Sequence, residues 1–228
     1  MAVSAPPALP EFIFFDLDDT LLDDEVSTQS GVNALFAHYS TDEVEDRHQR
    51  WDAALQLYYP DFLAGRINVQ QLQQSRIRHV LPERMFTDEE ALAAFEYFMV
   101  HYVEGSTLFS DTRDAISRLK ARGIGLGVIS NGPNDMQVRK LTAVGLYDEL
   151  DVVVTAERAG VGKPNVAIFD FALAEANKQA KDCWCIGDNL NNDVLAANEA
   201  GLTGVLLDRN GRNIDYAGLK IAALDEIA

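Results

Sequence analysis

The sequence predicts an α/β fold: a doubly wound, Rossmann-like parallel sheet with a helical-bundle domain inserted into it. Short apolar runs alternate with helical patterns through the second half of the chain, which is typical of a parallel sheet covered by helices on both faces. The first apolar run is separated from the next by nearly half of the chain, far more than a loop inside such a unit needs. We therefore expect an α/β core formed by residues 1–24 and 106–228 and a helical cap domain formed by residues 25–105.

Five apolar runs bounded by turn residues are predicted as buried strands: Phe12–Phe15, Ile124–Ile129, Val152–Val154, Cys183–Ile186 and Gly204–Leu207. Patterns of helical periodicity follow or separate the later runs: Asp111–Arg122, Asn134–Val144, Asn165–Asn177 and Asp193–Ala200. This alternation predicts that all five strands run parallel, because each connection crosses the sheet through a helix.

The inserted stretch has helical periodicity throughout. Apolar residues recur at the spacing of one helix face: Val44, Trp51, Leu55 and Tyr58, and then Leu92, Phe95, Met99 and Tyr102. Helix breaks are expected at Pro60 with Gly65 and at Pro82. The insertion is therefore predicted to be a small helical bundle, with Trp51 in its core.

The composition is that of an acidic globular protein. Its 228 residues carry a formal net charge of −17 and are 47% hydrophobic, which is enough apolar material for one sizeable core. The charge repels nucleic-acid backbones and anionic membranes, and no apolar run approaches the roughly 18 residues that cross a bilayer. The opening MAVSAPPALP lacks the features of a secretory signal and is predicted to be a loose tail. We expect a cytoplasmic protein, monomeric or homodimeric, with neither a nucleic-acid nor a membrane partner.

Polar side chains follow the predicted strands where the strands end. Ligands of open parallel sheets bind beyond these carboxyl ends, so eight residues are expected to converge there: Asp16, Asp18, Thr20, Ser130, Asn131, Lys163, Asp188 and Asp193. Crowded carboxylates repel one another, so a positive partner is expected among them. Four aspartates at one rim suit Mg²⁺, which binds through a few carboxylates and several waters.

The same residues can carry out phosphoryl transfer, which needs a nucleophile, charge neutralisation and a proton donor. Asp16, directly at the strand end, is the expected nucleophile and would form an aspartyl-phosphate. Asp18, in a pocket of low dielectric constant, is expected to protonate the leaving oxygen. Ser130 and the amides that follow it can hydrogen-bond the phosphate, and Lys163 can neutralise it.

The metal would be held by the aspartates. Asp188 is expected to bind it directly together with Asp16, and Asp193 is expected to act through water or by supporting a ligand. Asn131, next to Ser130, is a further candidate for contact with the phosphate.

These segments resemble, in the same order, the four motifs of the haloacid dehalogenase-like phosphatase superfamily. The matching segments are DLDDT from Asp16 to Thr20, VISNG with Ser130 and Asn131, GVGKPNVAIF with Lys163, and GDNLNND from Gly187 to Asp193. Each motif is weak alone, but the four together are highly specific. The resemblance implies that the Asp18 main-chain carbonyl also binds Mg²⁺, that Thr20 makes an orienting hydrogen bond to the site, and that the insertion is a cap.

Two features favour the phosphatase branch of that superfamily. Its dehalogenases lack an acid at the position of Asp18, because they have no leaving oxygen to protonate. Its phosphonate hydrolases need a cap lysine for a Schiff base, and no lysine precedes Lys120.

The cap pattern resembles 5′-nucleotidases and N-acylneuraminate-9-phosphatases in these residues: Trp51, Tyr58, Tyr59, Gly65, Ile67, Leu72 and Arg76. A small phosphorylated metabolite is expected as substrate, a nucleoside monophosphate first.

Arg76 lies one helical turn after Leu72 and one before Val80, so it puts a guanidinium on an apolar helix face. It is a candidate substrate contact; stacking on an aromatic ring or pairing inside the cap is the alternative. Other functions also stay open. They are a sugar- or acid-phosphate phosphatase, a phosphosugar mutase that grips a second phosphate with basic cap residues, and a non-catalytic binding module on the same fold.

Overall fold

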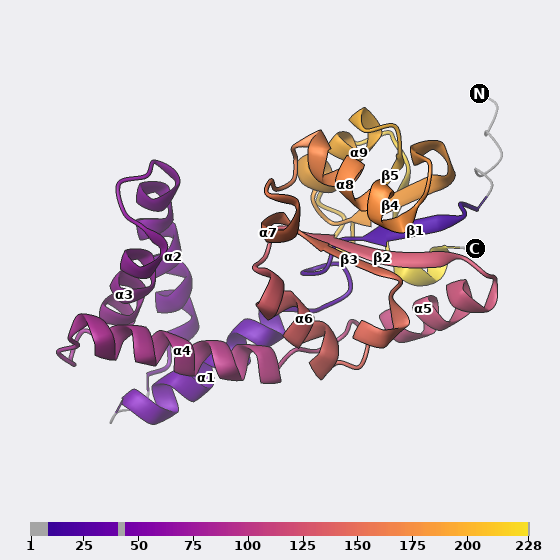
Figure 1. The fold of residues 1–228 in the computed structure, drawn as a ribbon. Coiled ribbons are helices and arrows are strands. Elements are labelled where there is room, and N and C mark those ends of the chain that lie inside the picture. Colours follow the sequence, from indigo (N-terminus) through magenta and orange to yellow (C-terminus); the bar gives the residue numbers. More distant parts are fainter. Residues whose placement is uncertain (1–8, 41–43, 228) are drawn as a thin grey trace. The chain divides into compact units, whose positions relative to one another are not determined.

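The computed structural model describes residues 9–40 and 44–227. The chain divides into two compact units, one formed by Met1–Asp24 with Thr107–Ala228 and the other by Glu25–Ser106 (Figure 1). Residues 1–8, for which the sequence predicts a loose tail, lie outside the described part. Within the described part, no helix combines the length and the apolar character needed to cross a membrane.

The first unit is built on a six-stranded parallel sheet. The strands run in the order β3-β2-β1-β4-β5-β6, and their bounds are β1 Phe12–Phe15, β2 Gly125–Ser130, β3 Val152–Thr155, β4 Cys183–Gly187, β5 Thr203–Leu207 and β6 Lys220–Ile221. The chain first adds strands on one side of β1 and then returns to add β4 on the other. The predicted doubly wound α/β fold is confirmed.

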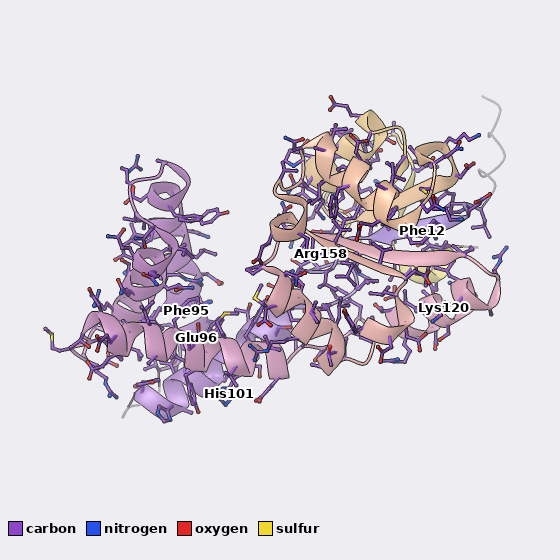
Figure 2. The ribbon with its side chains drawn as sticks, in the orientation of Figure 1. Phe12, Phe95, Glu96, His101, Lys120 and Arg158 are labelled. Atoms are coloured by element: carbon purple, nitrogen blue, oxygen red, sulfur yellow. The ribbon has the colours of Figure 1, made fainter. Side chains whose placement is uncertain are left out.

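Helices cover both faces of this sheet (Figure 1). The longer elements are α5 Thr112–Ala121, α6 Asn134–Ala143, α7 Ala156–Ala159, α8 Val166–Ala176 and α9 Ala196–Glu199, with a π-helical turn at Leu190–Leu195. Single 3-10 turns are formed by Tyr147–Glu149, Ala180–Asp182 and Leu224–Glu226. The alternation of β1 supplies both layers of the core: Ile13 and Phe15 pack with α5 and α6, and Phe12 (Figure 2) and Phe14 pack with α8 and α9.

The register brings three strand ends together. Phe15 of β1 is level with Val128 of β2 and Ile186 of β4, so the residues that follow each strand emerge side by side. All four residues of β1 are buried, and the first polar residue after them is Asp16. The edge of the sheet that binds ligands in such folds therefore carries the predicted site residues.

The second unit consists of helices. Its elements are α1 Asp24–Tyr39, which starts in the first unit, α2 Arg47–Leu63, α3 Val69–Val80 and α4 Asp88–Glu104. Capping boxes begin α3 at Asn68 and α4 at Thr87, each satisfying backbone amides that the first helical turn leaves unpaired. Trp51 is buried and packs on Phe98, with ring centroids 4.1 Å apart, which confirms its predicted place in the core of the bundle.

Some details of this unit differ from the prediction. α2 includes Pro60 and ends at Leu63, so the break predicted at Pro60 with Gly65 lies between these two residues, and Gly65 follows it with a positive φ of 67°. Leu55 is 37% exposed although its periodicity predicts burial. On α4 the buried face includes Ala94 and Phe98, which lie beside the predicted stripe.

Candidate active site

The carboxyl ends of β1, β2 and β4 surround a pocket of about 260 Å³ in the first unit. Seven of the eight residues predicted to converge line it, all except Thr20: Asp16, Asp18, Ser130, Asn131, Lys163, Asp188 and Asp193. The other lining residues are Asp19, Gly132, Asn189 and Asn192. The structure thus brings together groups that are separated by up to 177 positions in the sequence, from Asp16 to Asp193.

Lys163 is the positive group at the base of the pocket. Its Nζ donates to Asp16 Oδ1, to Asp193 Oδ1 and to the Ile129 carbonyl, at 2.6, 2.6 and 2.7 Å. Burial alone would lower the pKa of this ammonium, but the charges of Asp16 and Asp193 outweigh it and raise the pKa above its ordinary value. Lys163 is therefore charged, and all three of its N–H groups have a fixed direction.

Three carboxylates beside this lysine form a candidate metal centre. Asp16, Asp188 and Asp193 each offer one oxygen, and these atoms lie within 4.8 Å of one another. Burial, together with the charge of Asp193, raises the pKa of Asp16 to about 6 against the opposing charge of Lys163. Burial and then the charges of Asp16 and Asp193 raise the pKa of Asp188 to about 7. Three oxygen donors of like charge at this spacing fit a hard divalent cation such as Mg²⁺.

The fourth predicted motif gains its geometry from a glycine. A Cβ at Gly187 would lie 2.3 Å from Asp193 Oδ2, so only glycine lets this carboxylate approach the end of β4. The Asn189 amide donates to the same oxygen at 3.0 Å. Asp193 is 1% exposed, and its other oxygen accepts from Lys163, so both of its oxygens have fixed partners.

Asp18 points to helix α6 and is not among the three clustered carboxylates. Its Oδ2 accepts from Gln137 Nε2 at 2.9 Å, and its Oδ1 accepts from the ammonium of Lys140. Burial raises the pKa of the Asp18 carboxyl, although the charge of Lys140 acts against the rise. The metal contact predicted for this residue, through its main-chain carbonyl, stays a prediction.

Ser130 and Asn131 lie at the end of β2. Ser130 Oγ accepts from Gln137 Nε2 at 2.7 Å and from the Gly132 amide at 3.2 Å. The Asn131 side chain bonds the backbone of Lys163 twice, donating to its carbonyl at 2.9 Å and accepting from its amide at 2.7 Å. The described contact of Asn131 is therefore with the lysine segment, whose position it holds.

Thr20 is completely buried behind the carboxylates. Its hydroxyl lies 3.5 Å from Asp16 Oδ2 and accepts from the Asp188 amide at 3.2 Å. These are contacts that orient two of the acids. Its carbonyl accepts from Arg209 at 3.0 Å, so the segment is held from the end of β5 as well.

Arg76 belongs to the second unit, on helix α3. Its guanidinium carbon lies 4.0 Å from the Trp51 ring centroid and 5.9 Å from that of Phe95. Burial lowers its pKa to about 10, so it stays charged at neutral pH. The stacking on an aromatic ring that the sequence allows for is thus present, and contact with substrate stays a prediction.

Sequence reasoning missed two residues of the site, Gln137 and Lys140. Both are completely buried, and they lie three positions apart on one face of α6. A signal for them exists in the sequence: at helical spacing, Lys140 shares a face with Val144, and Gln137 shares one with Leu141. A lysine and a glutamine on the apolar face of the helix that follows VISNG indicate a polar target beneath it.

A larger cavity of about 560 Å³ lies beside β3, lined by residues of α6, α7 and α8 among others. Arg158 (Figure 2) lines it, but its guanidinium is already paired with Glu175 at 2.6 Å. None of the predicted site residues lines this cavity. Of these two cavities, only the smaller one combines acids and a hydroxyl with a buried cation, Lys163. The smaller pocket is therefore the candidate active site.

Known proteins resemble both the sequence and the fold. Residues 11–201 match the family model described as haloacid dehalogenase-like hydrolase. Pyrimidine 5′-nucleotidase YjjG of Escherichia coli is 32% identical over 89% of this chain and 88% of its own. Glyceraldehyde 3-phosphate phosphatase of Methanothermobacter thermautotrophicus is 28% identical over 95% and 96%.

A solved structure supports the fold. The magnesium-bound putative hydrolase YfnB of Bacillus subtilis superposes with a TM-score of 0.81 at 22% identity, over 96% of this chain and 97% of that one. The family model spans most of the chain, and the nucleotidase exceeds 30% identity over nearly all of it. The chain belongs to the haloacid dehalogenase-like hydrolases, and it is an enzyme of their phosphatase branch.

Proposed function

We propose that the protein is a Mg²⁺-dependent phosphatase that hydrolyses a small phosphomonoester through an aspartyl-phosphate, with a nucleoside monophosphate as the favoured substrate. The observation that carries the proposal is the group around Lys163. One buried ammonium holds Asp16 and Asp193 at 2.6 Å each, in a pocket that Asp18 and Asp188 also line. This is a nucleophile, a charge-neutralising group and a proton donor in one place.

In the first step, an oxygen of Asp16 forms a bond to phosphorus while the bond from phosphorus to the leaving oxygen breaks. Asp18 gives its proton to that oxygen, so the product leaves as a neutral alcohol. Lys163 holds Asp16 Oδ1, which fixes the direction of the carboxylate. Ser130 and the Lys163 ammonium offset the negative charge of the phosphoryl group.

In the second step, water attacks the phosphorus of the aspartyl-phosphate, and Asp18 accepts the proton that the water loses. The bond from phosphorus to the Asp16 oxygen breaks, which releases inorganic phosphate and restores both carboxyl groups. One water is consumed for each phosphomonoester. Asp18 therefore serves first as acid and then as base, and its protonation state is the same before and after one turnover.

Asp16, Asp188 and the Asp18 carbonyl would hold the Mg²⁺, with Asp193 supporting them. When bound, the cation supplies neutralisation of the carboxylates and of the phosphate in the same pocket. The proposal draws support from the spacing of the three acids and from the raised pKa values of Asp16 and Asp188, because a divalent cation offsets both the burial and the mutual repulsion that raise these pKa values.

The choice of substrate rests on sequence similarity to two relatives with named substrates. The nucleotidase relative is the more similar in identity, and the triose phosphate phosphatase covers more of the chain. A nucleoside monophosphate is therefore favoured, and a sugar or acid phosphate is the second candidate. A phosphosugar mutase and a non-catalytic module are less favoured, because the nucleophile, the metal acids and the lysine are all present.

The second unit, Glu25–Ser106, is proposed as a cap that selects the substrate, with Arg76 as its candidate contact. Its support is the insertion of a separately compact helical unit between β1 and β2, at the position where the family carries such caps. A charged guanidinium on an aromatic ring is suited to recognising an anion or a flat base.

Phosphate release tests this function. The full chain is assayed with Mg²⁺ and with EDTA on nucleoside monophosphates, ribose 5-phosphate, glyceraldehyde 3-phosphate, sialic acid 9-phosphate and phosphoglycolate. We expect metal-dependent release, fastest for a nucleoside monophosphate. Asp16→Asn should lower the rate by about 10³-fold or more, while Asp170→Asn, an exposed aspartate on α8, should leave it unchanged.

Turnover by Asp16→Asn at the wild-type rate would contradict the nucleophile assignment. Metal-independent release would contradict the Mg²⁺ assignment, and release from no phosphomonoester by folded protein would contradict the phosphatase proposal as a whole. A preference for a sugar or acid phosphate would replace the nucleotide with the second candidate.

A further inference from the structure

Helix α6 holds the Asp18 carboxylate by both of its oxygens. Gln137 Nε2 donates to Oδ2 at 2.9 Å, and Lys140 Nζ donates to Oδ1. An ionised carboxylate offers about four acceptor positions, so the two donors fix the plane of the group and leave acceptor positions for the proton that Asp18 transfers. The orientation of Asp18 is therefore imposed from one side by a single helix.

Both donors are deeply buried and are themselves held in place. Gln137 and Lys140 have no exposed surface. Lys140 Nζ also donates to Asp24 Oδ1 at 3.2 Å, and Gln137 Nε2 also donates to Ser130 Oγ at 2.7 Å. One amide group of Gln137 thus bridges the proton-transfer residue and the predicted phosphate-binding hydroxyl.

The chain makes room for this bridge. A Cβ at Gly132 would lie 2.2 Å from Gln137 Nε2, so the glycine after Asn131 leaves the space that the glutamine side chain fills. Gln137 Oε1 is buried without a hydrogen-bond partner within the described structure. A buried acceptor left unpaired has a cost, so the amide is held in this place against a local penalty.

We propose that Gln137 and Lys140 are positioning residues for proton transfer by Asp18, acting on the first step through the leaving oxygen. The inference rests on the proposed phosphatase function and deepens it by assigning two residues that the four motifs do not contain. Neither residue is proposed to touch the substrate. Their contribution is to keep the carboxyl in line with the leaving oxygen, since small misplacements of a catalytic group cost large factors in rate.

This role has a consequence that a purely structural ion pair lacks. An alkoxide is a poor leaving group and needs the proton, whereas p-nitrophenolate leaves readily without it. Loss of positioning should therefore slow alkyl phosphates selectively. Loss of packing or of the folded fraction should slow both kinds of substrate by the same factor.

The experiment compares kcat/KM for p-nitrophenyl phosphate and for glycerol 2-phosphate in the Mg²⁺-loaded full chain. This constant reports the steps up to release of the alcohol, so the later hydrolysis of the aspartyl-phosphate does not enter it. The variants are Lys140→Met, Gln137→Leu and the conservative Lys140→Arg. Lys120→Met is the matched control, because Lys120, a residue of α5 (Figure 2), forms an exposed ion pair with Glu149.

We expect Lys140→Met and Gln137→Leu to lower kcat/KM for glycerol 2-phosphate by about 10²-fold, the usual contribution of a positioned acid, and that for p-nitrophenyl phosphate by less than about fivefold. Lys140→Arg should retain most of the wild-type ratio of kcat/KM for glycerol 2-phosphate to that for p-nitrophenyl phosphate, and Lys120→Met should leave this ratio unchanged. Circular dichroism gives the folded fraction; if Lys140→Met is unfolded, Gln137→Leu and Lys140→Arg carry the comparison.

Equal losses for both substrates in the folded variants would overturn the positioning role and leave the phosphatase proposal standing. Absence of wild-type turnover on p-nitrophenyl phosphate and on every phosphomonoester of the panel would overturn both. The two failures are therefore distinguishable by the wild-type rate alone.

Discussion

At the scale of single residues, Arg76 distinguishes packing from recognition. Its guanidinium stacks on Trp51 at 4.0 Å, and its Nε is buried without a hydrogen-bond partner within the described structure. We expect Arg76→Met, which keeps the length of the side chain but removes its charge, to raise KM for the preferred substrate by about tenfold and to change the ranking of substrates. Loss of the stacking should also cost about 0.5–2 kcal/mol of stability.

The control for this prediction is Arg84→Met in the same unit. Arg84 is exposed and lies 5.0 Å from the Tyr39 ring centroid, so it shares the aromatic contact without the burial. Its replacement should leave the substrate ranking unchanged. A loss of stability in Arg76→Met, measured by urea unfolding, without any change in ranking would assign Arg76 to packing alone.

A site residue can be identified from the sequence when its immediate neighbours in the chain are enough to indicate its role. Asp16 and Lys163 could be identified because each belongs to a short motif next to a strand or loop that the pattern also predicts. For Gln137 and Lys140 the sequence carries only a partial signal, their place on an apolar helix face, because nothing in the helix itself specifies that Asp18 is their partner. Asn131 could be identified as a residue of the pocket, but its contacts with the Lys163 backbone could not, because they join segments 32 positions apart.

At the scale of elements, an ion pair ties α5 to β5. Arg209, just after β5, donates twice to Asp111, just before α5, at 2.9 Å each. The Leu224 amide donates to the same carboxylate at 2.7 Å. Burial alone would raise the pKa of Asp111, but the hydrogen bonds from Arg209 and Leu224 outweigh it and hold the pKa below its ordinary value of 3.8.

The lowered pKa of Asp111 determines how its contribution to the free energy of unfolding depends on pH. Because the pKa of Asp111 is lower in the folded state, its stabilisation is present above pH 3.8 and is lost as the pH falls through the lower folded value. We expect Asp111→Asn to lower the free energy of unfolding by about 1–3 kcal/mol at pH 7. The gap to wild type should stay constant down to about pH 4 and narrow below it.

Urea unfolding of both proteins between pH 7 and pH 3 measures this gap. Asp114→Asn, an exposed acid in the first turn of α5, is the control and should change stability by less than about 1 kcal/mol. A gap that widens on acidification would contradict the assigned direction of the Asp111 shift.

Elements follow from the sequence when their pattern is strong and local. The five predicted strands all form, because runs such as Phe12–Phe15 are apolar on both faces. β6, with only Lys220 and Ile221, lacks such a run and depends on pairing with β5. On α4 the predicted residues Phe95 and Tyr102 are buried, but the buried face also includes Ala91 and Ala94, small residues that a hydrophobicity pattern weighs too lightly.

At the scale of the whole molecule, length and spacing predict the sheet, the insertion and the convergence of the strand ends. They do so because connections in parallel sheets obey strict rules of length and handedness. The same reasoning cannot predict which cap residues reach the substrate. Periodicity within α1 to α4 indicates which face of each helix is buried, but it carries no information on which exposed side chains contact a ligand.

The net charge of −17 leads to a prediction about salt. A phosphomonoester dianion approaching this protein is repelled at long range, while Lys163 is already neutralised by Asp16 and Asp193 and adds little to the distant field. Salt shortens the Debye length from about 30 Å at 0.01 M to about 8 Å at 0.15 M and thus weakens this repulsion. We expect kcat/KM to rise severalfold over that range at saturating Mg²⁺, while kcat stays constant because the buried groups are poorly screened.

Rates with p-nitrophenyl phosphate in NaCl and in potassium acetate of equal ionic strength measure the effect and separate screening from specific ion binding. Agreement between the two salts is expected. A fall in kcat/KM with salt would mean that attraction dominates the approach of the substrate. Such a result would contradict the long-range repulsion that we assign to the net charge of −17.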